Sequence, residues 1–353
     1  MKLIHCADIH LGSKLTSKFP KEKSDERKSE LLSTFARMVD YARDNDINVI
    51  LLSGDVFDKD KPAIKDKNFF YKAVKNNPDI DFLYLNGNHD KEGSYTVDDI
   101  PNLKTFNKQD FTSYTYGDIV ISGIEMCKEN AQGFYSKLAL DKEKMNIVML
   151  HGDVSDSSGM DKVKISELKG KGIDYLALGH IHSYKTGRID DRGEYAFPGC
   201  LEPRGFDECG EKGFIVLDVT NRVTHTFVPF ASRTIIELPV IVTGAADLYE
   251  VRQKVMSAAK SIDRKNILLV QLEGELSVEA DIDEKDIENA LSDYYFVHVK
   301  NKCGVMVDVN DYKDDRSLIG EFIRGVDSKD CDLQRKQELL TLGLRLLNGK
   351  EVD

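Results

Sequence analysis

The chain has 353 residues, with 49 lysines and arginines against 61 aspartates and glutamates, for a net charge of −12. This length predicts two domains, and 41% hydrophobic with 31% charged residues is the balance of an ordinary globular protein. The composition excludes a disordered, collagen-like or coiled-coil chain. No apolar run approaches the roughly 18–20 residues that span a bilayer.

The N-terminus and the cysteines indicate the compartment. The opening MKLIHCADIHLG reaches charged and imidazole side chains within ten residues, so we expect no signal peptide. The 6 cysteines are scattered and form no CxxC pair, which is typical of reduced thiols and not of a disulfide framework. We therefore expect a cytoplasmic protein that does not associate with membranes.

Short apolar strands and amphipathic helices alternate through the first two thirds of the chain. The first helix has its apolar residues at helical spacing, and Ser24 or Asp25 could cap it. Strand–helix–strand alternation predicts parallel strands in a layered α/β fold. In chain order we expect strand Lys2–Ala7, helix Ser24–Asn45, strand Asn48–Ser53, helix Ile64–Lys75, and strands Phe82–Leu85, Ile119–Ile124, Ile147–Leu150, Tyr175–Leu178 and Phe214–Val219.

The pattern changes near Ser232. The next segments predict a small α+β domain, in the order strand Ile235–Val242, helix Ala246–Ala259, strand Ile267–Leu272, helix Glu284–Ser292 and strand Tyr295–Lys300. The leucine-rich tail Asp332–Asn348 predicts a helix that is apolar over much of its circumference.

Histidines and carboxylates gather where the predicted strands end. In parallel sheets ligands bind at that edge. Residues two apart on an extended segment point the same way, so Asp8 and His10 could share one ion. A single Asp or His at such a place is usually a turn or core residue, but here five motifs follow five apolar strands. The candidate ligands are Asp8, His10, Asp55, Asn88, His151, His180 and His182.

The chemistry of these donors indicates two metal ions. Oxygen and imidazole nitrogen donors without a thiolate suit two hard or borderline divalent ions better than one tetrahedral zinc. Two ions roughly 3.5–4 Å apart are the arrangement that hydrolyses phosphate esters. His89 is left over beside Asn88 and could protonate the leaving oxygen or stabilise phosphoryl charge, with Asp90 placed to orient it.

The same motifs resemble the calcineurin-like metallophosphoesterases. The chain carries DIH, GDVFD, GNHD, HGD and GHIH in that order. Within that superfamily the opening MKLIHCADIHLG, the GDVFD run and the segment Phe197–Asp207 followed by EKGF are similar to the SbcD-type DNA repair nucleases.

This resemblance implies a layered β-sandwich flanked by helices, with a small α+β capping domain and a C-terminal helix. It implies that Asp8, His10 and His182 hold one ion, that Asn88, His151 and His180 hold the other, and that Asp55 bridges them. It further implies a metal-bound hydroxide as nucleophile. The expected ions are Mn²⁺, with Fe²⁺ and Zn²⁺ as alternatives that nothing in the sequence excludes.

The resemblance also implies a domain order and partners. We expect a catalytic domain at 1–232, a capping domain at 233–310 and a docking segment at 311–353. The partner would be an SMC-like coiled-coil ATPase, bound through the leucine-rich helix, although that helix could equally pack on its own capping domain. A homodimer through Ser24–Asn45 is a further expectation.

Three functions compete. The first is a DNA exo/endonuclease that acts in repair with the ATPase, and the second is a phosphodiesterase or phosphatase of small molecules that uses the same two ions. The third, a silent scaffold, is disfavoured because every candidate ligand is present. A net charge of −12 argues against strong autonomous DNA binding. Arg204 is a candidate substrate contact, with a structural salt bridge as the alternative.

Overall fold

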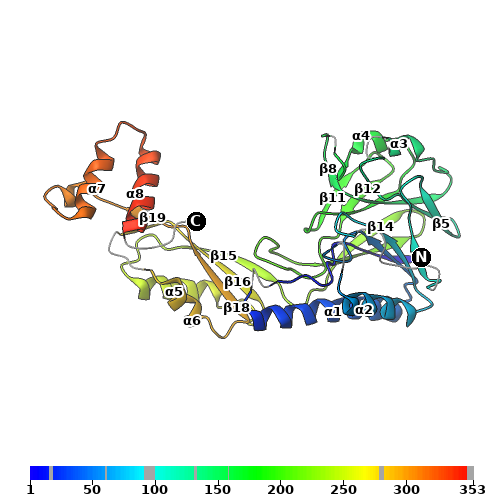
Figure 1. The fold of residues 1–353 in the computed structure, drawn as a ribbon, viewed down its shortest axis with the longest axis horizontal. Helices are drawn as coiled ribbons and strands as arrows, with labels where there is room; N and C mark the ends of the chain where they lie inside the picture. Colours follow the sequence, from blue (N-terminus) through cyan, green and yellow to red (C-terminus); the bar gives the residue numbers. More distant parts are fainter. Residues whose placement is uncertain are drawn as a thin grey trace. The chain divides into compact units, whose positions relative to one another are not determined.

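A computed structural model describes residues 1–15, 19–59, 62–90, 100–130, 133–157, 159–277 and 282–347 (Figure 1). The chain divides into two units, Met1–Thr234 and Ile235–Asp353. The further boundary expected at residue 310, and the functions given to the expected domains, stay predictions. Among the described residues, no helix combines the length and apolar character needed to cross a membrane.

Two six-stranded sheets face each other in the first unit. The first sheet has the order β14 (Val223–Pro229), β13 (Gly213–Val219), β1 (Lys2–Cys6), β2 (Val49–Ser53), β3 (Asp81–Leu85) and β4 (Leu103–Thr105). The second has the order β11 (Lys185–Arg188), β12 (Glu194–Phe197), β10 (Tyr175–Gly179), β7 (Met145–His151), β6 (Ile119–Gly123) and β5 (Thr112–Tyr116). In each sheet the strands that lead to the predicted ligands run parallel to one another.

Alternate residues of the strands enter different cores, which is why these strands are apolar on both faces. Leu3 and Val49 of the first sheet share a core with Ile147 and Met149 of the second sheet. Their neighbours Ile4 and Ile50 face helices α1 (Lys21–Asp44) and α2 (Ile64–Lys75), which lie along the first sheet (Figure 1). On the outer face of the second sheet, α3 (Phe134–Lys137) and α4 (Ile165–Leu168) contribute Phe134 and Leu168 to a third core.

The first helix begins earlier than expected. The expectation that Ser24 or Asp25 caps it is wrong, because α1 starts at Lys21 and its N-cap is Pro20, without a side-chain cap. The Ser24 amide already donates to the Pro20 carbonyl at 2.8 Å, and the Ser24 hydroxyl donates to Phe19 O at 3.0 Å. Ser24 is therefore a buried residue of the first turn.

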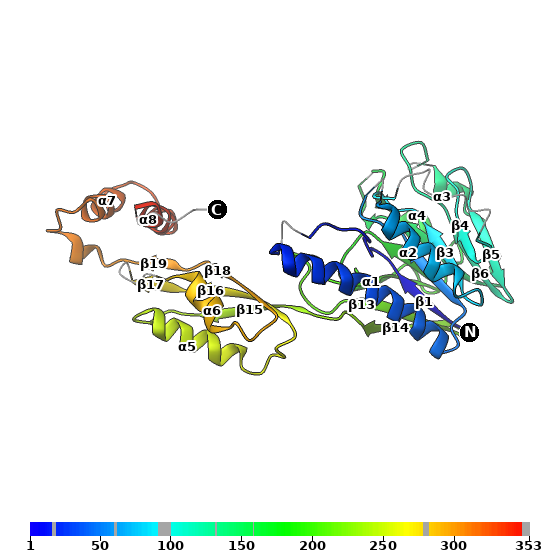
Figure 2. The same cartoon turned by 60° about the horizontal axis from the view of Figure 1, so that its bottom comes forward.

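The second unit contains the parallel sheet β15 (Ile235–Ile241), β16 (Ile267–Glu273) and β18 (Phe296–Asn301). Helices α5 (Leu248–Ala259) and α6 (Glu284–Ala290) connect these strands and cover one face (Figure 2). A two-stranded sheet of β17 (Glu275–Ser277) and β19 (Gly304–Met306) follows. The mixed α/β fold of sheets flanked by helices is thus confirmed.

Two helices end the described chain. α7 (Leu318–Asp327) was not expected, although Ser317 caps it by accepting a hydrogen bond from the Gly320 amide at 3.1 Å. α8 (Leu333–Leu347) matches the expected leucine-rich helix, and a short 3₁₀ helix at Val309–Tyr312 precedes α7. On α8, Leu344 is buried whereas Leu342 and Leu346 are exposed. Leucines of this helix therefore lie on both its buried and its exposed side.

Candidate metal centre

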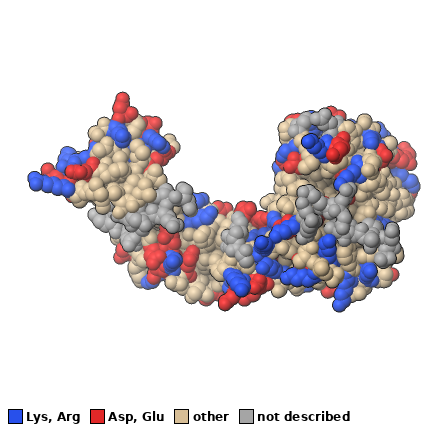
Figure 3. Space-filling view, in the orientation of Figure 1, with Lys and Arg blue, Asp and Glu red and all other residues tan. Residues whose placement is uncertain are grey.

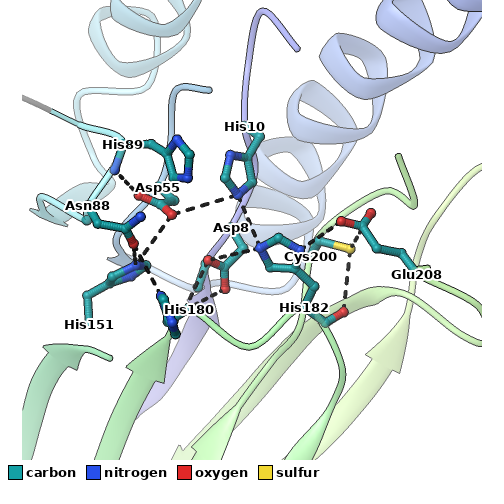
Figure 4. A network of polar contacts seen from close by, with 12 residues as sticks. Asp8, His10, Asp55, Asn88, His89, His151, His180, His182, Cys200 and Glu208 are labelled. Atoms are coloured by element: carbon teal, nitrogen blue, oxygen red, sulfur yellow. Dashed lines mark hydrogen bonds and ion pairs between the residues drawn. The ribbon is translucent and has the colours of Figure 1, made fainter. Parts of the chain in front are cut away.

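The carboxyl ends of strands from both sheets meet at one place (Figure 4). Asp8 and His10 follow β1, Asp55 follows β2 and Asn88 follows β3. From the second sheet, His151 ends β7, and His180 and His182 follow β10. The structure therefore brings together all seven side chains that the sequence analysis singled out as ligands.

The backbone at this place is unusual. Six described non-glycine residues have a positive φ, and four of them are Asp8 (51°), His10 (53°), Asp55 (54°) and His180 (100°). Residues other than glycine rarely adopt a positive φ, and those that do cluster at functional sites. The left-handed turns aim the side chains of these residues at one another directly after the strands.

Hydrogen bonds between the sheets hold those turns. The His180 amide donates to both carboxylate oxygens of Asp8 at 3.0 Å. The His151 Nδ1 donates to the Ser53 carbonyl at 2.8 Å. Glycine allows this approach, because a Cβ atom on Gly54 would lie 2.1 Å from His151 Nδ1, and one on Gly179 would lie 1.9 Å from Ser53 O.

Asp8, His10 and His182 form what we call the first ligand group. One potential ligand atom from each lies within 4.8 Å of the others. The two Nε2 atoms are 3.3 Å apart, and His182 Nε2 is 3.9 Å from Asp8 Oδ1. Two imidazole nitrogens that face each other beside a buried carboxylate leave lone pairs directed at one point, which suits a cation.

Asn88, His151 and His180 form the second ligand group. The Asn88 Oδ1 lies 3.0 Å from His151 Nε2 and 3.2 Å from His180 Nδ1. Asp55 lies between the groups, since its Oδ2 is 3.4 Å from His151 Nε2 and 3.8 Å from His10 Nε2. Asp8 is also close to His151 and Asp55, with ligand atoms within 4.8 Å.

His89 and Asp90 have different surroundings. His89 is exposed, its amide donates to Asp55 Oδ1 at 2.9 Å, and its ring centre is 5.2 Å from that of His10. Asp90 is buried, and its carboxylate accepts hydrogen bonds from the amides of Val56, Phe57 and Gly87. These contacts hold the loops after β2 and β3 together. Orientation of the His89 ring by Asp90 stays a prediction.

Burial and charge set the protonation of the site. Burial raises the pKa of Asp8 to about 6 and lowers that of His10 to about 4. Burial opposes charge on His151, but the hydrogen bond and the negative charge of Asp55 raise its pKa to about 9. Burial likewise opposes charge on Asp55, yet His151 holds the pKa of that carboxyl below its usual range. Without a cation, a proton on His151 therefore balances the buried carboxylates.

Arg204 lies at the edge of the first ligand group. It forms ion pairs with Asp58 at 3.1 Å and with Glu208 at 2.7 Å. Glu208 in turn accepts from His182 Nδ1 at 2.7 Å. The sequence analysis did not assign roles to Asp58, which lies in the GDVFD run, or to Glu208, which directly follows the segment Phe197–Asp207. Arg204 thus makes the salt bridges that were its alternative interpretation, and its contact with a substrate stays a prediction.

These donors fit divalent metal ions. Buried carboxylates need a positive partner, and neutral imidazoles and an amide oxygen complete two adjacent sets of oxygen and nitrogen donors. The first group could hold one ion and the second group another, with Asp55 placed to touch both.

A model of the calcineurin-like phosphoesterase family matches residues 1–184. The chain belongs to this family. The prediction of a metal-dependent phosphoesterase is confirmed at this level. The family match covers the strands that carry every candidate ligand and ends two residues after His182.

Several relatives of the family are named as DNA repair proteins. The chain is similar to the DNA double-strand break repair protein Mre11 of Sulfurisphaera tokodaii (27% identity over 205 residues, 54% of this chain and 51% of that protein). It is also similar to Mre11 of Sulfolobus acidocaldarius (23% over 360 residues, 92% and 91%). A third relative is the uncharacterized metallophosphoesterase YhaO of Bacillus subtilis (28% over 239 residues, 63% and 58%). The matches thus span about half of the first relative and nine tenths of the second.

The chain is weakly similar in fold to two solved structures. The protein TT1561 of Thermus thermophilus aligns with a TM-score of 0.42 at 12% identity, over 64% of this chain and 98% of that one. A dimetal phosphatase from Danio rerio aligns with a TM-score of 0.40 at 10% identity, over 65% and 99%.

Because His151 carries a proton until its pKa of about 9, metal loading must displace that proton. We expect Mn²⁺ binding at pH 7.5 to release about one proton, and the affinity to rise about tenfold per pH unit up to about pH 9. Calorimetric titration in buffers of different ionisation enthalpy measures this release. Binding at pH 7.5 without proton release would contradict the pairing of His151 with Asp55.

Proposed function

We propose that the protein hydrolyses phosphodiester bonds of DNA with two divalent metal ions. The observation that carries the proposal is the position of Asp55, whose Oδ2 lies within 3.8 Å of both His10 and His151. A carboxylate shared between two histidine groups is what a pair of bridged ions requires. In this proposal Asp8, His10 and His182 hold one ion and Asn88, His151 and His180 the other.

The side chains of the site have different roles in this mechanism. When bound, the two ions would lower the pKa of water and draw charge from the phosphoryl oxygens. Asp55 and Asp8 balance the positive charge, and both are almost fully buried. His89 is exposed beside the site and held by its amide to Asp55, so its imidazole can reach a bound ester from outside the ligand groups. We assign it to protonation of the leaving oxygen or to stabilisation of phosphoryl charge.

The choice of DNA rests on the relatives and on the surface near the site. Two of the relatives are named as DNA double-strand break repair proteins, while the name of YhaO gives no substrate. The alternative, a phosphodiesterase or phosphatase of small molecules, uses the same ions. YhaO is compatible with that alternative.

A groove lined by lysines favours DNA over a small molecule as the substrate. It begins at Leu11 and Gly12, directly after His10, and runs between α1 and α2 with a volume of about 650 Å³. Four lysines line it against two aspartates, in a protein of net charge −12. Within the described chain Lys14, Lys59 and Lys65 have no ion-pair partner, whereas Lys28 pairs with Asp25 at 2.9 Å. Over the first half of α1, Figure 3 shows lysine and arginine side chains beside acidic ones.

The second unit is the candidate for partner binding. We propose that Ile235–Asp353 includes the capping domain and that α8 docks on an SMC-like coiled-coil ATPase. Leu342 and Leu346 lie one turn apart and are 45% and 59% exposed, a spacing that presents them together to a partner. A homodimer through α1 belongs to the same proposal, and Mn²⁺ is the proposed ion, with Fe²⁺ and Zn²⁺ as alternatives.

His89→Ala should reduce Mn²⁺-dependent hydrolysis of both linear DNA and a chromogenic small diester by about 10²- to 10⁴-fold. The variant should bind Mn²⁺ as the wild type does, because His89 is not among the assigned ligands. End-labelled DNA and the small diester are assayed in parallel with calorimetry. Loss of metal binding in this variant would contradict the role given to His89. Wild-type cleavage of the diester alone would contradict DNA hydrolysis by the chain alone and leave a partner-dependent nuclease or the alternative function.

Lys14→Glu with Lys65→Glu should weaken DNA cleavage, and each lost phosphate contact should lower the salt dependence of DNA binding by roughly 0.9 in log–log slope. Hydrolysis of the small diester should not change, because neither lysine contacts a candidate ligand. Lys142→Glu with Lys169→Glu, at two exposed lysines outside the groove, is the matched control for charge. Equal DNA cleavage by the double variant and the control would remove the groove from the substrate path.

A further inference from the structure

In each histidine of the first ligand group, Nε2 points into the group and Nδ1 points away from it. Their Nε2 atoms face each other at 3.3 Å, inside the group. On the outer side, His182 Nδ1 donates to Glu208 Oε1 at 2.7 Å, and His10 Nδ1 lies 3.4 Å from Asp58 Oδ1. Each imidazole of this group therefore has a carboxylate on its outer side, hydrogen-bonded in the His182–Glu208 pair (Figure 4) and in ion-pair distance only for His10 and Asp58.

Arg204 connects the two backing carboxylates. Its Nη1 donates to Asp58 Oδ1 at 3.1 Å, and its Nη2 donates to Glu208 Oε1 at 2.7 Å. The backbone amide of Arg204 donates to the other Glu208 oxygen at 2.6 Å. The guanidinium thus spans the carboxylates behind His10 and His182, a geometry that only a planar fork of donors provides.

The Glu208 side chain is buried and hydrogen-bonded on both oxygens. Its side chain is 5% exposed, and its Oε2 also accepts from Cys200 Sγ at 3.5 Å. Lys212, which is fully buried, donates to the His182 carbonyl at 2.8 Å. A buried carboxylate with this many fixed partners has one position, and it fixes the ring of His182 in turn.

The second ligand group has different backing. His151 Nδ1 donates to the neutral carbonyl of Ser53 at 2.8 Å. His180 approaches Asn88 with its Nδ1, and its Nε2 is 3.7 Å from Asp161, whose side chain is 42% exposed. A carboxylate behind an imidazole raises its basicity as a metal ligand and fixes its tautomer, whereas a carbonyl adds no charge. The two metal positions are therefore unequal.

We propose that Arg204 is a positioning residue, which holds Asp58 and Glu208 against His10 and His182 and thereby makes the first ligand group the tighter of two metal positions. The inference rests on the proposed two-ion function and deepens it. Arg204 acts through the carboxylates, and its Nη2 also lies 3.0 Å from His182 Nδ1; it needs no contact with the substrate. It also explains why an arginine lies so close to a site that is to hold cations, since the guanidinium neutralises the carboxylates that support the ligands.

Calorimetric titration of the metal-free full chain with Mn²⁺ tests this inference. The wild type should bind two ions in two resolved steps. Glu208→Gln, which keeps the shape but not the charge, should weaken the tighter step about 10- to 100-fold and leave the weaker step unchanged. Arg204→Lys should weaken the same step less, because an ammonium cannot bridge both carboxylates. Manganese electron paramagnetic resonance at one equivalent should change from one species to a mixture in Glu208→Gln.

Arg192→Lys is the matched control for Arg204→Lys, because Arg192 forms a similar ion pair with Asp174 away from the site. It should leave both binding steps as in the wild type. If Glu208→Gln weakens both steps together, or changes neither, Glu208 is only structural and the inference is wrong. Hydrolysis is not part of this titration. Unequal binding of two ions by a wild type that cleaves no diester would overturn the proposed function and not this inference.

Discussion

The site depends on the hydrogen bonds and the charge of the buried Asp8 carboxylate. It is 0% exposed, follows the central strand of the first sheet and accepts the His180 amide of the second sheet on both oxygens. A charge in this position costs several kcal/mol of desolvation unless partners compensate it. Those partners are the amide, the nearby histidines and, in the proposed function, the metal ions. The same carboxylate therefore joins the sheets and requires positive charge nearby, which a protonated His151 or, in the proposed function, the cations supply.

This requirement explains the strained backbone. Asp8, His10, Asp55 and His180 keep left-handed conformations that cost of order 1–3 kcal/mol each. Hydrogen bonds between the loops after β1 and β2, such as Asp8 N to Gly54 O at 3.0 Å and His10 N to Asp55 O at 2.9 Å, fix these turns. The continuous cores on either side of the sheets supply the stability that such local strain consumes.

Much of this site could be predicted because it is local in sequence. Each candidate ligand follows an apolar strand, and parallel strands bring their carboxyl ends to one edge. The supporting residues are not local, since Asp58 and Arg204 meet across 146 positions. No periodicity predicts that contact. Glu208 had a weak signal, because it lies four residues after Arg204, but only the fold shows that it faces His182.

The helices also differ in how well the sequence predicted them. The spacing in Ile64–Lys75 predicted α2 to the residue, because its pattern repeats over three turns. The start of α1 was misjudged because Ser24 and Asp25 are good caps in isolation, while the chain turns into the helix at Pro20.

The most direct test of the account is anomalous diffraction at the manganese edge from crystals of the full chain soaked in Mn²⁺. We expect two peaks, one among Asp8, His10 and His182, and one among Asn88, His151 and His180, with the Asp55 carboxylate between them. One peak, or peaks that Asp55 does not touch, would contradict the two-ion site.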